Sequence, residues 1–188
     1  MAPVSTGAEK FEFRVVSEDE IDSIEPGWDW ASGACDTQEE AWREAEQLLR
    51  WACQLHEIGL SISHNGYHKH SAYVLRHADM PGFSRQEQAR LAAIVLGHTG
   101  KLPKMKDLID NEDDWRLVMC LRLAAVLHRS RSTDAAPPFT LRADKRGYAL
   151  TAPYDWLERN PLTEYDLRQE IEEWQRLGTD LRLVVIAS

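Results

Sequence analysis

The sequence from residue 84 to residue 100 is SRQEQARLAAIVLGHTG. Ser84 and Glu87 have the spacing of a capping box, in which each side chain accepts a hydrogen bond from the other residue's backbone N–H at the start of a helix. Apolar residues then recur every three or four positions as far as His98, and Gly100 supplies a stop signal. The stretch therefore predicts an amphipathic helix with a defined start, one buried face and a defined end.

Further segments on either side carry the same helical periodicity. The first begins at Asp36 and Thr37, which are alternative N-cap residues, and Gly59 follows its end. A loop of Ser, Asn and Gly separates it from the next segment. The predicted helices of this region cover residues 36–57, 67–78, 84–98 and 113–129.

Past Pro137-Pro138 the hydrophobic period changes from that of a helix to that of a strand. Alternating segments follow near residues 139–142 and 148–151, and residues 181–186 form a third apolar run. A helix is predicted to begin at Asn160-Pro161, before the last strand. We therefore expect a mainly α (α+β) fold, with a bundle of about five helices followed by a small antiparallel β-sheet and one covering helix.

The amino-terminal residues 1–33 differ from the rest of the chain. They hold eight acidic and two basic side chains, and the alternation of Phe11, Phe13 and Val15 with polar residues predicts one short strand. We expect an acidic extension, tag or graft of unknown role over residues 1–33. A single domain is expected over residues 34–188.

Charge is distributed unevenly along the chain. The formal net charge is −9, yet residues 61–132 hold eleven basic and seven acidic side chains. A locally positive region inside an acidic protein favours an anionic ligand, although a mixed solvated surface would show the same counts.

Composition and termini point to a cytoplasmic protein without a membrane partner. No apolar run approaches the roughly 18 residues that cross a bilayer, and the first residues lack the pattern of a secretory signal. Cys35, Cys53 and Cys120 are odd in number and widely spaced. They indicate reduced thiols in place of a disulfide framework or a thiolate zinc site.

Three histidines, His56, His98 and His128, fall on the predicted inner faces of three different helices. A helical bundle builds metal sites from such inward side chains, although a single buried histidine is more often a hydrogen-bonded core residue. His64, His68 and His70 offer a weaker zinc hypothesis, since no thiolate or carboxylate completes that set.

The histidine pattern resembles the HD superfamily of metal-dependent phosphohydrolases. Glu57 follows His56 where that superfamily has aspartate, and Ala125 stands where a later aspartate is expected. Hard cations need clustered oxygen ligands, so we interpret the metal site as degenerate. The alternative is a working nucleotide phosphohydrolase that uses His56, Glu57, His98 and His128.

A closer resemblance is to the exopolyphosphatase/guanosine pentaphosphate phosphatase family, whose carboxy-terminal part contains such an HD-like helical bundle. An ordered series of motifs carries it over roughly residues 40–186. These motifs are Leu55-His56-Glu57-Ile58-Gly59, Ile62-Ser63-His64, His68-Lys69-His70-Ser71-Ala72-Tyr73, Asp79-Met80-Pro81-Gly82-Phe83-Ser84, Val95-Leu96-Gly97-His98, the segment from Leu121 to His128, and the segment from Trp156 to Leu162.

The resemblance implies that catalysis belongs to two amino-terminal domains of the actin-like ATPase type, which use magnesium. This chain shows no glycine-rich phosphate loop, so we expect a non-catalytic domain without a cofactor of its own. The implied partners are polyphosphate or guanosine pentaphosphate, through the parent enzyme, and a second copy in a homodimer. We expect no nucleic acid and no membrane as partners.

The resemblance also implies that this domain helps to form a basic passage for polyphosphate. Several spaced cations would bind such a chain mainly through charge and counterion release. The candidate polyphosphate-binding residues are Lys69, His70, Arg76, Lys101, Lys104, Arg129 and Arg131. The alternative for Lys101 and Lys104 is that they bind no ligand. They would then lie in a solvated loop, where their charge balances that of the nearby acidic residues.

Overall fold

The computed structural model describes residues 12–14, 38–129, 139–144 and 146–187. Two compact units share the chain. The helical unit is Ser32–Arg129, and the sheet unit combines Met1–Ala31 with Ser130–Ser188. Each unit is described by itself below.

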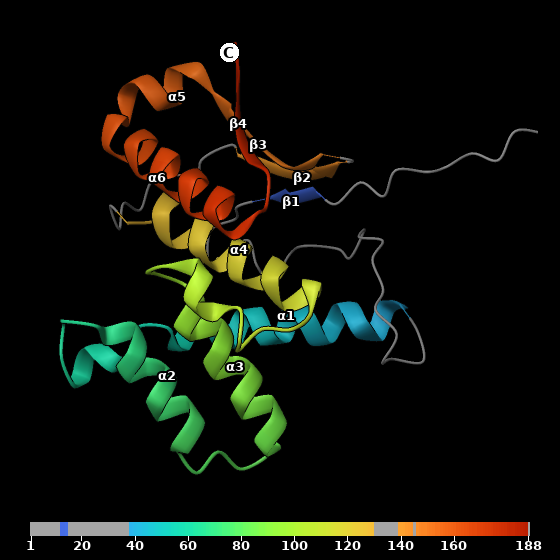
Figure 1. Cartoon of the computed structure of the whole chain (residues 1–188), viewed down its shortest axis with the longest axis vertical. Helices are drawn as coiled ribbons and strands as arrows, with labels where there is room; N and C mark the ends of the chain where they lie inside the picture. The colour runs from blue at the N-terminus through green and yellow to red at the C-terminus, as the bar shows by residue number, and fades with distance from the viewer. Residues whose placement is uncertain (1–11, 15–37, 130–138, 145, 188) are drawn as a thin grey trace, which may run out of the picture. The chain divides into compact units, whose positions relative to one another are not determined.

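The helical unit contains four α-helices in its described part (Figure 1). Two 3-10 helices, η2 (Ile58–Ser61) and η3 (Leu102–Met105), lie in the connections. All four predicted helices of this region are confirmed, with ends that differ by a few residues. Their bounds are α1 (Gln38–Leu55), α2 (Tyr67–His77), α3 (Arg85–Gly97) and α4 (Glu112–Leu127).

The predicted capping box opens α3. The Glu87 N–H donates to Ser84 Oγ at 3.2 Å, and the Ser84 N–H donates to Glu87 Oε2 at 2.6 Å. Beyond the helix, Gly100 has φ +86°, a left-handed conformation that glycine adopts without strain. The local start and stop signals of this segment are therefore both confirmed.

The core of the helical unit is made by the apolar faces of α1, α3 and α4. Ala52, Leu91, Val95 and Val118 are fully buried. A Cβ atom at Gly97 would lie 3.1 Å from both methyl groups of Val118, so the glycine lets α3 and α4 pack closely. The predicted inner faces thus form one close-packed interior.

The described residues of the sheet unit form four strands in the order β1-β2-β3-β4. The strands are β1 (Glu12–Arg14), β2 (Thr140–Asp144), β3 (Gly147–Pro153) and β4 (Leu181–Ile186). The β1–β2 and β2–β3 pairs are antiparallel, with Leu141 opposite Leu150. The short strand predicted near residues 11–15 is therefore confirmed as β1.

The mainly α fold with a small sheet is confirmed, but the expectation of a fully antiparallel sheet is wrong. β4 pairs with β3 in parallel, with Leu183 opposite Leu150. The reason is the connection, because α5 (Tyr154–Arg159) and α6 (Pro161–Leu177) carry the chain back before β4 begins (Figure 1). The helix α5 was not predicted.

The sheet unit has its own hydrophobic core. Leu150, Leu167, Trp174 and Leu181 are buried, and the Trp174 indole N–H donates to Glu170 Oε1 at 2.7 Å. That bond satisfies the polar edge of a large buried ring. None of the helices in the described residues is both long and apolar enough to cross a membrane.

Candidate functional site

The segment after α1 is fixed to α2 by hydrogen bonds through a buried serine. The Gly59 N–H donates to Ser71 Oγ at 2.9 Å, and the Ser71 hydroxyl donates to the His56 carbonyl oxygen at 2.7 Å. A Cβ atom at Gly59 would lie 2.1 Å from the Tyr67 carbonyl oxygen. Only glycine permits this approach, so residues 56–59 and the start of α2 form one rigid corner.

His98 is a buried and hydrogen-bonded histidine. Its ring Nδ1 lies 2.6 Å from the Val95 carbonyl oxygen, and Nε2 lies 3.0 Å from the Tyr67 hydroxyl oxygen. Burial lowers the pKa of the His98 imidazole to about 4, so the ring is neutral near pH 7. In that state Nδ1–H donates to Val95 and Nε2 accepts from Tyr67, which uses both ring nitrogens.

Two other histidines lie beside His98. The His56 ring centroid is 5.0 Å from that of His98, with the rings nearly perpendicular, and the His68 centroid is 6.3 Å away. His56 Nδ1 lies 2.7 Å from the Cys53 carbonyl oxygen. The structure therefore brings together His56 and His98, as their faces predicted, and adds His68.

The prediction that His128 also points inward is wrong. Helix α4 ends at Leu127, and His128 is its C-cap residue with φ −98° and ψ 9°. Because the backbone leaves the helix there, the side chain no longer follows the buried face, and His128 is exposed.

The metal-site hypotheses use residues that are spread over this region. Among the residues that the structure describes, no group of three or more His, Cys, Asp or Glu is arranged to hold a metal ion. This applies to the sets built on His56, Glu57, His98 and His128 and on His64, His68 and His70.

The candidate phosphate-binding cations occupy α2 and the region after α3. Lys69, Arg76, Lys101 and Lys104 are exposed, and His70 is half-buried. Arg129 is exposed after α4, where it has a partner. Arg131 lies outside the described residues.

The segment after α3 comes close to the first turn of α2, next to two of these cations. A Cβ atom at Gly100 would lie 3.7 Å from His68 Nε2, so the end of α3 meets the first turn of α2. Lys69 follows His68 in the chain, and Lys101 follows Gly100. Two lysines that are 32 positions apart in the sequence therefore flank one contact.

A buried arginine adds positive charge beside the contact of His68 with Gly100. Arg122 of α4 is buried, and its Nη1 donates to the carbonyl oxygens of Gly97 at 2.8 Å and Gly100 at 3.1 Å. The pKa of His68 is lowered first by partial burial and then by the positive charges of Lys69, Arg122 and His70. Sequence reasoning missed Arg122, although a lone arginine within an apolar helical run was a signal for it.

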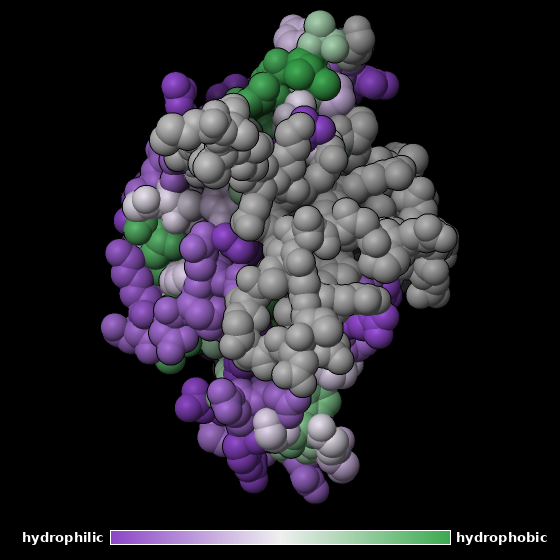
Figure 2. Space-filling model, turned by 90° about the vertical axis from the view of Figure 1, so that its right-hand side faces the viewer, coloured by the Kyte–Doolittle hydropathy of each residue, from purple (hydrophilic) through white to green (hydrophobic). Residues whose placement is uncertain are grey.

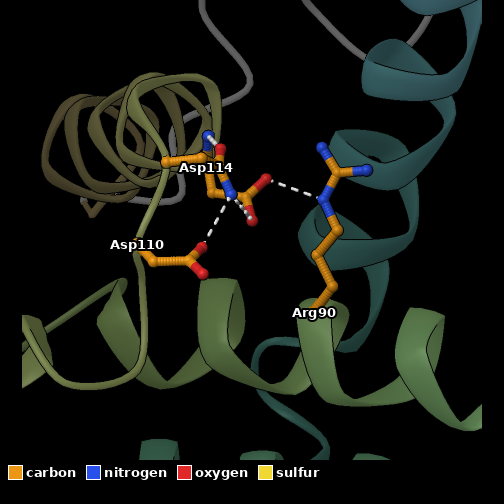
Figure 3. Close-up of polar contacts among 4 residues, drawn as sticks. Arg90, Asp110 and Asp114 are labelled. Carbon is orange, nitrogen blue, oxygen red and sulfur yellow. Dashed lines mark hydrogen bonds and ion pairs between the residues drawn. The ribbon is translucent and has the colours of Figure 1, made fainter. Parts of the chain in front are cut away.

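Other basic residues of the helical unit are neutralised by carboxylates. Arg90 Nε donates to Asp114 Oδ1 at 2.7 Å, beside the Asn111 side chain that caps α4 (Figure 3). Arg116 pairs with Glu112 and Asp113. By contrast, Lys69, Arg76, Lys101 and Lys104 have no ion pair with any residue in the described part of the chain.

The ordered motifs and a match to a family model define the class of protein as a phosphatase domain. Residues 29–171 match the family model described as Ppx/GppA phosphatase, domain III. The chain belongs to the Ppx/GppA phosphatase family, as the motif series predicted.

Relatives from several bacteria support the same assignment. Each is a guanosine-5'-triphosphate,3'-diphosphate pyrophosphatase. The Aeromonas hydrophila protein is 33% identical over 165 residues, which cover 83% of this chain and 33% of that protein. The Pseudoalteromonas translucida protein is 38% identical over 137 residues (71% and 28%), and the Vibrio cholerae protein is 36% identical over 149 residues (77% and 30%). The chain thus matches about a third of the length of these relatives.

Proposed function

We propose that this chain is a non-catalytic domain of an exopolyphosphatase-like phosphatase, which binds polyphosphate and contributes to dimer assembly. The observation that carries the proposal is the contact of His68 with Gly100, because Lys69 and Lys101 are the next residues in the chain after these two. The relatives' name gives guanosine pentaphosphate as the alternative substrate of the parent enzyme. The reduced thiols expected from the cysteine spacing support a cytoplasmic location.

The charged side chains around the contact of His68 with Gly100 suit a chain of phosphates. Exposed cations without carboxylate partners are not neutralised by the protein and can attract an anionic ligand. The charges of Arg90 and Arg116, by contrast, are neutralised by ion pairs with Asp and Glu side chains. Within a Debye length of about 8 Å at physiological salt, the local field outweighs the total charge of −9. Binding at Lys69 and Lys101 is therefore compatible with an acidic protein.

The experiment is a binding titration of the chain with polyphosphate at several salt concentrations. We expect log affinity to fall linearly with log salt concentration, and the double variant Lys69→Gln/Lys101→Gln to flatten the slope by about 0.7 for each lysine that touches the ligand. The matched control is Arg168→Gln/Arg176→Gln on α6, which removes the same charge from arginines that are already paired. Equal losses in both double variants would show diffuse attraction without a site.

The dimer part of the proposal is supported by exposed apolar side chains of the sheet unit. Val184, Val185 and Ile186 lie at the exposed end of the edge strand β4, and Leu162 and Tyr165 are exposed on α6. Figure 2 shows hydrophobic side chains grouped at the top of the view, where the end of β4 lies in Figure 1. Patches of this kind are used in subunit interfaces. Sedimentation should show a dimer, and a strict monomer at tens of micromolar would contradict this part.

A second candidate function is the nucleotide phosphohydrolase that uses His56, Glu57, His98 and His128, although in the described part of the chain these residues are not arranged to hold a metal ion. The single observation in its favour is the contact between the His56 and His98 rings. Its test is the metal content of the purified chain, together with phosphate release from polyphosphate and nucleotides. We expect no release by the chain alone, whereas turnover that His56→Ala abolishes would establish this second function.

A further inference from the structure

The end of α3 is held by a buried side chain from another helix. Arg122 of α4 is 4% exposed, and its Nη1 donates to the carbonyl oxygens of Gly97 and Gly100. The last carbonyl groups of an α-helix have no N–H partner within the helix. One guanidinium nitrogen therefore joins the last residue of α3 to the residue that precedes Lys101.

The needs of a helix end do not account for an arginine at this position. Helices commonly satisfy their last carbonyl groups with backbone N–H groups near a left-handed glycine, and Gly100 has such a conformation. A buried guanidinium loses its hydration, which is costly unless hydrogen bonds replace the water. What Arg122 adds, beyond filling the core, is a fixed backbone path from Gly97 to Gly100.

The backbone path after α3 determines where Lys101 starts. Leu102 is fully buried, so it anchors the chain on one side of Lys101. On the other side lies Gly100, and a glycine can adopt many backbone conformations because it has no Cβ atom. The hydrogen bond from Arg122 restricts that choice, so both neighbours of the exposed Lys101 are held in place.

The same backbone segment lies against the first turn of α2. A Cβ atom at Gly100 would lie 3.7 Å from His68 Nε2, and Lys69 follows His68 in the chain. Arg122 is buried behind this contact and cannot reach a ligand in solvent. Its effect on a bound anion is therefore indirect, through the placement of Lys101 relative to α2.

We propose that Arg122 is a positioning residue of the anion site, whose hydrogen bonds to Gly97 and Gly100 hold Lys101 where it meets the same polyphosphate chain as Lys69. This inference rests on the proposed function. It adds the residue through which two exposed lysines from different elements act as one site. Without Arg122, Gly100 adopts other conformations and Lys101 no longer binds the ligand together with Lys69.

The test is a double-mutant cycle on the whole 188-residue chain, which measures how the affinity for polyphosphate depends on salt. In a plot of log affinity against log salt concentration, each cation that touches a flexible chain of phosphates contributes a slope of about 0.7. Lys101→Gln and Arg122→Met should each flatten the slope by about 0.7, and the double variant should be no flatter than either single variant. If Arg122 acted only through its charge, Lys101→Gln would flatten the slope equally with and without Arg122.

The matched control is Gln88→Met on α3. Gln88 is also buried, and its Nε2 donates to two carbonyl oxygens at the end of a helix, those of Leu75 and Ala78. Neither carbonyl group is adjacent in the chain to Lys69 or Lys101. Gln88→Met should therefore leave the effect of Lys101→Gln unchanged, although it removes a comparable pair of hydrogen bonds.

The outcomes separate this inference from the proposed function. If the unmodified chain does not bind polyphosphate at low salt, both are refuted. If Lys101→Gln has the same effect with and without Arg122, or loses its effect in Gln88→Met as well, the positioning role is refuted while the anion site stands. Circular dichroism shows which variants are folded, and Arg122→Gln replaces Arg122→Met if the latter does not fold. Unfolding of both Arg122 variants would overturn the inference, because Arg122 would then support the whole helical unit.

Discussion

The glycine at position 59 provides a sharp test of how the corner is built. In Gly59→Ala the new methyl group would lie 2.1 Å from the Tyr67 carbonyl oxygen and 2.5 Å from the Ser71 nitrogen, where ordinary contacts exceed 3.4 Å. The start of α2 would have to move by more than about 1 Å, and both close contacts are with backbone atoms. Overpacking of this kind costs about 1–3 kcal/mol. A strained or broken hydrogen bond to Ser71 adds about 1 kcal/mol, so we expect a loss of about 2–4 kcal/mol in the free energy of unfolding.

Urea unfolding followed by tryptophan fluorescence measures this loss. The matched control is Gly82→Ala, because Gly82 has φ +95° and no atom within 4 Å of the new methyl group. That variant changes only backbone strain, which costs about 1 kcal/mol. A loss in Gly59→Ala no larger than that in Gly82→Ala would refute the argument that a backbone clash makes glycine necessary there.

Three further predictions concern the same helical unit. Ser84→Ala should cost about 1 kcal/mol of unfolding free energy in urea, because it removes one half of the capping box; an unchanged midpoint would contradict this. Asp114→Ala should cost about 1–3 kcal/mol by thermal or urea unfolding, since Arg90 and the Asn111 amide lose a charged acceptor, and Asp110→Ala on the exposed side should cost less. The pKa of His98 is lowered from 6.5 to about 4 on folding, so its share of stability is complete above pH 6.5 and is lost as pH falls toward 4. That share is about 3 kcal/mol, and urea unfolding of His98→Gln should lack this pH dependence; equal pH profiles would refute it.

The sequence predicted the elements of the helical unit well because their signals are local. The capping box at Ser84 and Glu87, the stop at Gly100 and the apolar periodicity lie within a few residues of the structures that they specify. The ordered motif series also identified the family. Local signals of this kind act wherever the segment lies in the fold.

Non-local geometry could not be predicted in the same way. The direction of β4 depends on the path through α5 and α6, which no strand pattern contains. The exposure of His128 depends on a helix end two residues earlier than the periodicity suggested. The contact of His68 with Gly100 joins segments about thirty residues apart, and the buried Arg122 beneath it becomes visible only in three dimensions.

The central claim is that polyphosphate binds where the first turn of α2 meets the segment after α3. Hydrogen exchange of the backbone amides, with and without polyphosphate, locates the ligand directly. The account predicts slower exchange at Tyr67–Lys69 and at Gly100–Lys104, with no change in α6, where the arginines are paired. Protection spread evenly over both units, or confined to α6, would contradict it.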